Sequence, residues 1–122
     1  MERLKTRPDF LRAARGVRKV VPSVTLELCK TPDAIAKPET VRVGFTASRK
    51  IGGAVERNRA KRRLRAAAAA LLPLYGIGGN DYVLVARPDT LTRPFAGLLD
   101  DLTAALHAAH TKLGRLTAGE PR

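Results

Sequence analysis

The chain of 122 residues is long enough for one domain with a modest core, since 44% of its residues are hydrophobic. Its 23 lysines and arginines against 11 acidic residues give a formal net charge of +12, which indicates a polyanionic partner and nucleic acid first. The single cysteine, Cys29, excludes an internal disulfide, and no apolar run reaches the ~20 residues of a membrane span, so we expect a cytoplasmic protein without a membrane partner.

The N-terminal segment predicts a short helix within residues 1–16. Pro8 and Asp9 suit the first turn of a helix, and Gly16 suits its end. Phe10 and its apolar neighbours give this helix one side that can pack against the rest of the protein.

Strands are expected next. A short extended segment at Arg18–Val21 ends at Pro22, and residues 23–29 alternate between apolar and polar side chains, as in a half-buried strand. Residues 31–38 contain turn formers and predict a loop. The alternation resumes over residues 41–47, which predicts another strand.

The longest helix signal runs from Val55 to Leu72, after which Pro73 is expected to end the helix. It follows a glycine-containing loop at residues 48–53. At 100° per residue, four apolar side chains fall on one narrow stripe, which predicts the face that packs on the core. These four are Ala60, Leu64, Ala67 and Leu71.

The C-terminal part predicts a turn, a strand and a last helix. After the turn at residues 76–80, Tyr82–Ala86 is entirely apolar and therefore predicts a central strand. Thr92 and Pro94 suit the start of a helix that continues to about Leu113. We expect one α+β domain over residues 1–113, which binds RNA, and a disordered tail over residues 114–122.

A dense basic segment lies in the first half of the long helix. Six of the nine residues from Arg57 to Arg65 are basic. Arg57, Lys61 and Arg65 align at i, i+4 and i+8, beside the apolar stripe. Asn58 and Arg62 widen this ridge, while Arg59 and Arg63 fall on the other flank of the helix.

This arrangement works against the helix that carries it. Like charges four residues apart cost ~0.2–0.5 kcal/mol per pair, and cations in the first turn oppose the helix dipole. The charge is therefore better explained by a ligand, namely phosphate oxygens, than by a basic face that is merely solvated.

Residues 42–65, from Arg42-Val43-Gly44-Phe45 through Ser48-Arg49-Lys50 to Arg57-Asn58-Arg59, closely resemble the bacterial ribonuclease P protein family. That family's motif is a strand ending in Ser-x-Lys, a loop with glycine, and an Arg-Asn-Arg helix that continues with further basic residues. The similarity extends to Arg3-Leu4-Lys5, Asp9-Phe10 and residues 81–87. It covers most of the chain, roughly from Arg3 to Leu106.

The resemblance implies a fold. The family has a two-layer α+β domain with the order αβββαβα, a four-stranded sheet and three helices, like the second domain of ribosomal protein S5. It also contains a left-handed crossover around the Arg-Asn-Arg helix, an exception to the usual handedness of such connections.

The resemblance also implies a function. The protein would assist ribonuclease P, an endoribonuclease, in removing the 5′ leader of precursor tRNA to give the mature tRNA 5′ end. The RNA subunit would perform the hydrolysis with Mg²⁺, and the protein itself would hold no catalytic residue, metal or cofactor. The partners would be this catalytic RNA and precursor tRNA.

The residues that match the family's RNA-binding motif and its leader cleft follow from the same resemblance. The RNA-binding set is Arg49, Lys50, Arg57, Asn58, Arg59, Lys61, Arg62 and Arg65. Phe10 matches an aromatic residue of the leader cleft, between the first helix and the sheet, although it could instead be a core residue. Many relatives carry a second aromatic one turn later, where this chain has Ala14, and Arg49 replaces a common lysine.

Other candidate sites are weaker. Cys29 suits a small strand residue better than a nucleophile, because no histidine lies near it in sequence. His107 and His110 have the spacing of metal ligands but no third ligand, and Gly76–Gly79 suits a plain turn better than an RNA-binding GxxG loop. Asp100 and Asp101 are adjacent on a helix and point to different sides, which suits no catalytic pair.

Two other functions compete with the ribonuclease P subunit. Another small basic RNA-binding protein, such as a ribosomal protein, would share the charge and could share the fold. A nuclease that acts without RNA would need an acid–base or metal constellation, which the sequence lacks. Activation of a ribonuclease P RNA would distinguish these possibilities.

Overall fold

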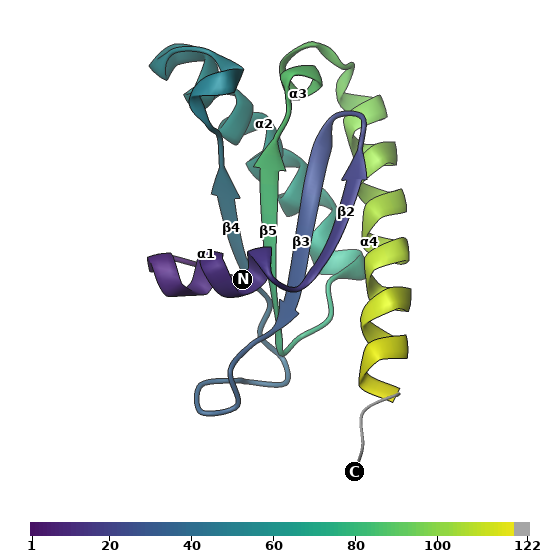
Figure 1. Ribbon diagram of the computed structural model, residues 1–122. Coiled ribbons are helices and arrows are strands. Elements are labelled where there is room, and N and C mark those ends of the chain that lie inside the picture. Colours follow the sequence, from purple (N-terminus) through teal and green to yellow (C-terminus); the bar gives the residue numbers. More distant parts are fainter. Residues whose placement is uncertain (119–122) are drawn as a thin grey trace.

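The computed structural model describes residues 1–118 (Figure 1). In chain order its elements are β1 (Glu2–Arg3), α1 (Arg7–Ala14), β2 (Val17–Val21), β3 (Val24–Lys30), β4 (Arg42–Thr46), the 3₁₀ turn η1 (Arg49–Ile51), α2 (Ala54–Tyr75), β5 (Asn80–Ala86), α3 (Pro88–Thr92) and α4 (Phe95–Ala118).

The strands form one mixed sheet in the order β1-β4-β5-β3-β2. β4 runs parallel to both β1 and β5, whereas β3 is antiparallel to β5 and β2. The apolar strand β5 lies in the middle, which confirms the prediction of a central strand. The α+β class and the predicted order of the four longer strands and three longer helices are also confirmed.

Helices cover both faces of the sheet. The main core lies between the sheet and the pair α2 and α4, and it includes the whole predicted stripe of α2. On the other face α1 packs over a smaller cluster formed by Leu4, Ala13, Cys29 and Val83. Because β3 contacts helices on both faces, Thr25 and Cys29 are buried as well as Leu26, and the prediction of a half-buried strand is wrong.

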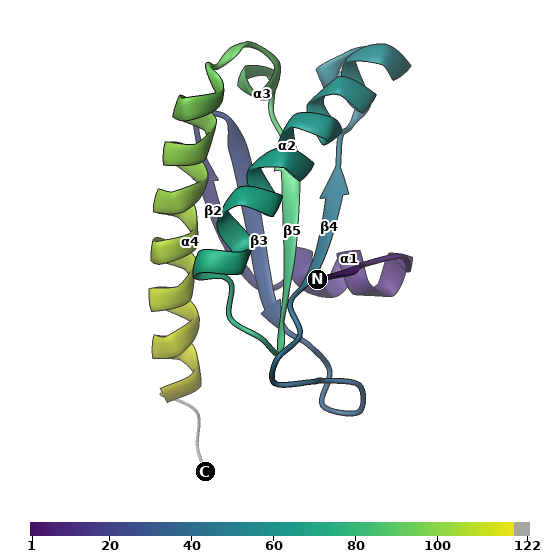
Figure 2. The same ribbon diagram turned by 180° about the vertical axis from the view of Figure 1, so that it is seen from behind.

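The crossover from β4 through α2 to β5 is left-handed. In Figure 2 both parallel strands point upward, α2 lies in front of the sheet, and β5 stands to the left of β4. A right-handed connection would place β5 to the right. The crossover implied by the family resemblance is therefore present.

The N-terminal helix is shorter than predicted. Glu2 and Arg3 form β1, an edge strand that pairs with Arg42 and Val43, and the helix begins only at Arg7. The pairing adds a fifth strand to the four expected. A two-residue strand has too few residues for alternation to show, so sequence pattern gives no signal for it.

Pro73 does not end α2, which continues to Tyr75. A proline lacks its own N–H and crowds the carbonyl four residues before it, but it does not remove the hydrogen bonds of the residues that follow. The last turn of α2 is completed by the hydrogen bond from Gly76 N to Leu72 O at 2.8 Å. The prediction that the helix stops at Leu72 is therefore wrong by three residues.

The C-terminal region differs in two ways. Thr92 ends the short helix α3 and does not cap α4, whose first hydrogen bond runs from Leu98 N to Pro94 O at 3.0 Å. α4 continues to Ala118, so the predicted disorder is wrong for residues 114–118, while residues 119–122 lie outside the described part of the chain.

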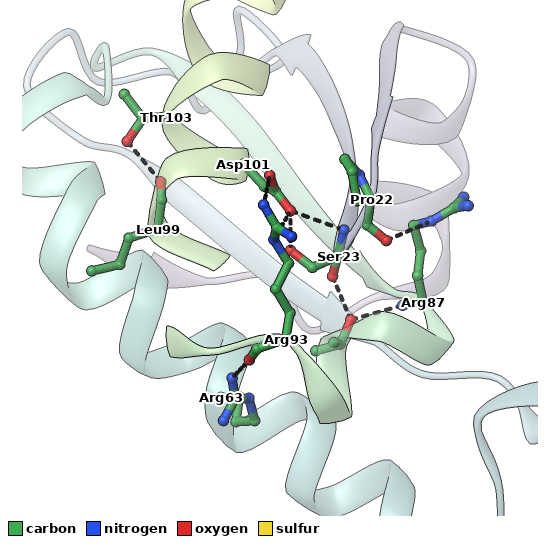
Figure 3. A network of polar contacts seen from close by, with 9 residues as sticks. Pro22, Ser23, Arg63, Arg87, Arg93, Leu99, Asp101 and Thr103 are labelled. Carbon is green, nitrogen blue, oxygen red and sulfur yellow. Dashed lines mark hydrogen bonds and ion pairs between the residues drawn. The ribbon is translucent and has the colours of Figure 1, made fainter. Parts of the chain in front are cut away.

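A buried polar network joins the start of α4 to three other elements (Figure 3). The Asp101 carboxylate accepts hydrogen bonds from Ser23 N and Oγ in the β2–β3 turn and pairs with Arg93 Nε at 2.7 Å. Thr90 Oγ1 of α3 donates to Ser23 O at 2.5 Å. Arg63 of α2 donates to Arg93 O, so the network also fixes α2 against the α3–α4 connection.

Candidate nucleic-acid interface

The basic half of α2 combines a buried stripe with a charged outer surface. Ala60 and Leu64 are fully buried against the sheet, which holds the helix in place. Asn58, Arg59, Arg62 and Arg65 are exposed, and Arg57 and Lys61 are half-buried. The ridge formed by Arg57, Lys61 and Arg65 with Asn58 and Arg62 therefore presents its charged ends to solvent beside a rigid face.

The charges of this segment have no acidic partners. The ion pairs among the described residues use Arg12, Lys37, Arg42 and Arg93, and none involves a basic side chain between Arg49 and Arg65. Glu56 is exposed and makes none of them. Only solvent, salt or a ligand therefore reduces the repulsion among the basic side chains of this helix.

The two flanks of α2 differ. Arg63 donates to Arg93 O on the side of α3 and α4, so this arginine has a structural role. The ridge lies on the opposite flank, toward the edge of the sheet that carries β4 and β1. The sequence placed Arg59 and Arg63 together on the second flank, and of these two only Arg59 is exposed.

The loop before α2 adds two more cations. Arg49 and Lys50 are exposed on the 3₁₀ turn η1, which begins where Ser48 Oγ accepts a hydrogen bond from Lys50 N at 3.3 Å. Gly52 has a φ of 142°, a conformation that other residues rarely adopt. This glycine lets the chain turn directly from the loop into the helix, so the loop and the ridge are continuous.

Phe10 lies on the other face of the sheet. Its ring rests on β4 at Gly44, where a Cβ atom would come within 2.6 Å of the ring. The ring is half-buried and packs against the Leu4 and Val83 cluster, while Ala14 is exposed at the end of α1. Phe10 therefore has part of its surface in the core and part free for contact.

An ion-pair network holds α1, and with it Phe10, against the sheet. Arg42 of β4 reaches Asp9 of α1 at 2.8 Å and Asp81 of β5 at 3.3 Å, and Thr31 Oγ1 donates to Asp81 at 2.7 Å. Burial alone would raise the pKa of Asp9, but hydrogen bonds from Thr6 and Arg42 outweigh it and lower the pKa.

Sequence reasoning missed this network. Asp9 and Arg42 are ordinary surface residue types, and their partnership depends on packing between elements more than 30 residues apart in sequence. The available signal was Asp81, a charged residue directly before the apolar run of the central strand, because a carboxylate is costly to bury without a partner.

The weaker candidates have structural explanations. Burial, reinforced by the charge of Asp81, raises the pKa of Cys29 to about 11, which makes it a poor nucleophile. His110 Nε2 lies 2.7 Å from Tyr82 Oη, and His107 packs edge-on against Tyr75. Gly76–Gly79 joins a helix to a strand, as a plain turn does, and within residues 1–118 no three potential ligands gather into a metal site.

A groove lies beside the β1 edge. It is lined by Glu2, Arg3, Lys5, Ile35, Lys37 and Arg42 and does not include Phe10.

No helix in the described part of the chain is both long enough and apolar enough to cross a membrane.

Known proteins resemble this chain over nearly its whole length. A family model described as Ribonuclease P matches residues 1–110. The ribonuclease P protein component of Ruegeria pomeroyi is 55% identical over 108 residues, which cover 88% of this chain and 85% of the relative. That of Caulobacter vibrioides is 51% identical over 114 residues, which cover 93% and 74%.

Solved structures show the same fold. The RNase P protein of Staphylococcus aureus superposes with a TM-score of 0.71 at 24% identity, covering 89% of this chain and 95% of that chain. The RNase P protein of Thermotoga maritima gives a TM-score of 0.69 at 24% identity, covering 87% and 96%.

Proposed function

The chain belongs to the ribonuclease P protein family, whose members are components of a tRNA-processing endoribonuclease, and from this premise we propose how it works. It binds the catalytic RNA of ribonuclease P through the α2 ridge and the preceding loop, and it binds the 5′ leader of precursor tRNA beside Phe10. The RNA subunit, with Mg²⁺, cleaves the leader to give the mature tRNA 5′ end. The protein acts in the cytoplasm.

The observation that carries this proposal is the unpaired charge of α2. Eight motif residues, from Arg49 to Arg65, share one loop and one helix, and none of their cations has a carboxylate partner among the described residues. A rigid row of cations matches the regularly spaced phosphates of a folded RNA and releases counterions when it binds.

The leader contact is supported by the placement of Phe10. An exposed part of an aromatic ring on a sheet surface offers a stacking platform for an unpaired base, worth ~1–3 kcal/mol per base. With Ala14 in place of a second aromatic, stacking contributes less, and leader binding depends more on the basic residues around the cleft.

Reconstitution with a ribonuclease P RNA tests the proposal. The protein should lower the Mg²⁺ concentration needed for precursor-tRNA cleavage, because its charges replace cations that the RNA otherwise recruits. Cleavage would be followed as a function of Mg²⁺ with and without protein. An unchanged Mg²⁺ requirement would contradict the proposal. Cleavage by protein that had been freed of RNA with ribonuclease before the assay would show a protein nuclease.

A further inference from the structure

A second basic surface lies at the opposite edge of the sheet from the α2 ridge. There α4 runs beside the edge strand β2, as Figure 1 shows, and a groove of about 650 Å³ separates their side chains. We call it the α4–β2 groove. Its lining residues are Lys19 from β2 and Ala104, His107, Ala108, Thr111, Lys112 and Arg115 from α4.

The sequence spacing explains why these side chains converge. On α4 the lining residues recur at three- and four-residue steps, so they form one stripe along the helix. On β2, Lys19 lies on the same side as the buried Val17 and therefore points toward α4. Ala104 and Ala108 are too small to fill the space, which leaves the floor of the groove open.

The electrostatic character of the groove is uniform. It has three cations, and no carboxylate lines it. Among the described residues, α4 carries no acidic side chain after Asp101, and no carboxylate lies within 4.0 Å of Lys19, Lys112 or Arg115. The groove is therefore complementary to a polyanion along its whole length.

Simpler explanations cover single residues only. Lys112 and Arg115 suit the C-terminal half of a helix through its dipole, and a lysine such as Lys19 protects an edge strand against pairing with another chain. Neither explanation requires the three cations to meet across one open groove.

An aromatic residue adds a second feature. Tyr75, at the end of α2, is 38% exposed, and its ring packs edge-on against His107 with the ring centroids 5.2 Å apart. Tyr75 does not line the groove itself but adjoins it through His107. An exposed ring next to a cationic groove is the combination that unpaired nucleotides use, with phosphates on the cations and a base on the ring.

We propose that the α4–β2 groove is a second RNA-binding site, in which Lys19, Lys112 and Arg115 contact phosphates and Tyr75 stacks on a base. The proposal shares with the proposed function only the premise that RNA is the partner. It gives the protein RNA contacts at both edges of its sheet, so that it bridges two segments of RNA.

Salt-dependent binding tests the site. Lys19→Ala and Lys112→Ala should each reduce the slope of log affinity against log salt by ~0.7–0.9, the effect of one phosphate contact. The matched control for binding of the catalytic RNA is Arg18→Ala, which removes the same charge from the neighbouring residue on the other face of β2, the face that carries α1. Binding is measured separately with the catalytic RNA and with precursor tRNA.

A tethered probe tests proximity independently of net charge. The native Cys29 is buried with its pKa raised to about 11, so a cysteine introduced by Thr111→Cys can be labelled selectively with a hydroxyl-radical source. It should cut RNA at positions different from those cut by the same probe attached through Asn58→Cys on the α2 ridge.

The outcomes separate the two proposals. The groove proposal is wrong, and the proposed function stands, if three results occur together. These are that the wild-type protein binds RNA, that the groove variants behave like Arg18→Ala, and that the probe on Thr111→Cys cuts no RNA. Groove-dependent binding without activation of the catalytic RNA would overturn the proposed function alone. A wild-type protein that binds neither RNA would overturn both.

Discussion

At the scale of single residues, the contact between Phe10 and Gly44 decides how the aromatic ring is presented. Glycine at position 44 allows the ring to lie directly on the β4 backbone. The Asp9–Arg42–Asp81 network fixes the helix that carries the ring. Ring position and ring chemistry can therefore be changed separately.

Phe10→Ala should weaken binding of precursor tRNA more than binding of mature tRNA, because only the precursor carries a leader to stack on the ring. A loss of ~1–3 kcal/mol is expected for one stacked base. Gly44→Ala keeps the ring but displaces it, and should give the same selectivity with a smaller loss. Affinities for both RNAs, measured on variants shown to be folded, check this, and an equal loss for both would mean that Phe10 serves only the core.

A second residue-scale feature is the contact of Tyr82 with His110. Tyr82 Oη accepts a hydrogen bond from Ile77 N at 2.8 Å, which leaves its own proton to be donated to His110 Nε2. Only the neutral imidazole can accept that proton. Burial, together with the neighbouring His107, lowers the pKa of His110 accordingly.

Protonation of His110 should therefore destabilise the fold. The pKa of an unfolded histidine is about 6.5 and that of folded His110 is lower, so its contribution to stability is complete above pH 6.5 and is lost as the pH falls through the folded pKa. Urea unfolding at pH 7.5 and 5.5 measures the change. The loss of unfolding free energy between pH 7.5 and pH 5.5 should be smaller in His110→Gln, because the amide oxygen of glutamine accepts a hydrogen bond at either pH. An equal loss in the wild-type protein and the variant would contradict the assignment.

At the scale of elements, one side of α2 packs in the core and the other side carries positive charge. Its apolar stripe packs on the sheet, while its outer side concentrates positive charge that opposes the helix itself. Function and stability should consequently respond to the same substitutions with opposite sign.

Replacing Arg57, Lys61 and Arg65 by alanine should lower the slope of log affinity against log salt by roughly 2–3, as expected for three lost phosphate contacts. The same variant should unfold at a higher temperature, because two like-charge pairs of ~0.2–0.5 kcal/mol disappear and alanine favours the helix. The control removes Arg18, Lys30 and Lys37, which are exposed outside α2. If both variants changed the slope equally, net charge and not the ridge would explain binding.

The elements that could be predicted from the sequence are those with a long periodic pattern. The apolar residues of α2, β5 and α4 each form a pattern long enough to show which side of the element packs in the core. The ridge follows from the same helical period. The assignment of its residues to RNA stays a prediction.

The differences arise where tertiary contacts override local signals. β1 exists only because β4 offers a free edge, and α3 is held by Thr90 and Ser23, which are far apart in sequence. Pro73 is accommodated because its neighbours in the last turn keep their hydrogen bonds. The Asp9–Arg42–Asp81 network could not be predicted, because no periodic pattern connects residues on three different elements.

At the scale of the whole molecule, the 23 lysines and arginines include two distant clusters, the α2 ridge and the α4–β2 groove. Neither surface has carboxylate partners among the described residues, so repulsion within each is relieved only by ions or RNA. Stability should therefore depend on the kind of anion present as well as on ionic strength.

Sulfate should raise the melting temperature more than chloride at equal ionic strength, because one multivalent anion can bind several neighbouring basic side chains of the native state. An anion at a hundred times its dissociation constant adds ~2.7 kcal/mol. Sulfate also stabilises proteins generally through exclusion from their surfaces. The Arg57, Lys61 and Arg65 alanine variant isolates the specific part, since its sulfate increment should be smaller, and an undiminished increment would argue against anion sites on the ridge.

The position of β5 in the sheet also determines the order in which the protein can fold during synthesis. β4 and β3 are neighbours of β5 and not of each other, so the β1–β4 and β2–β3 pairs share no hydrogen bonds until residues 80–86 have been made. At ~5–20 residues per second, the 56 residues between the end of β3 and the end of β5 take roughly 3–11 s to translate. During that interval the nascent chain exposes unpaired strand edges and, once residues 57–65 have been made, a polycationic segment as well. The sheet is completed only when its central strand arrives.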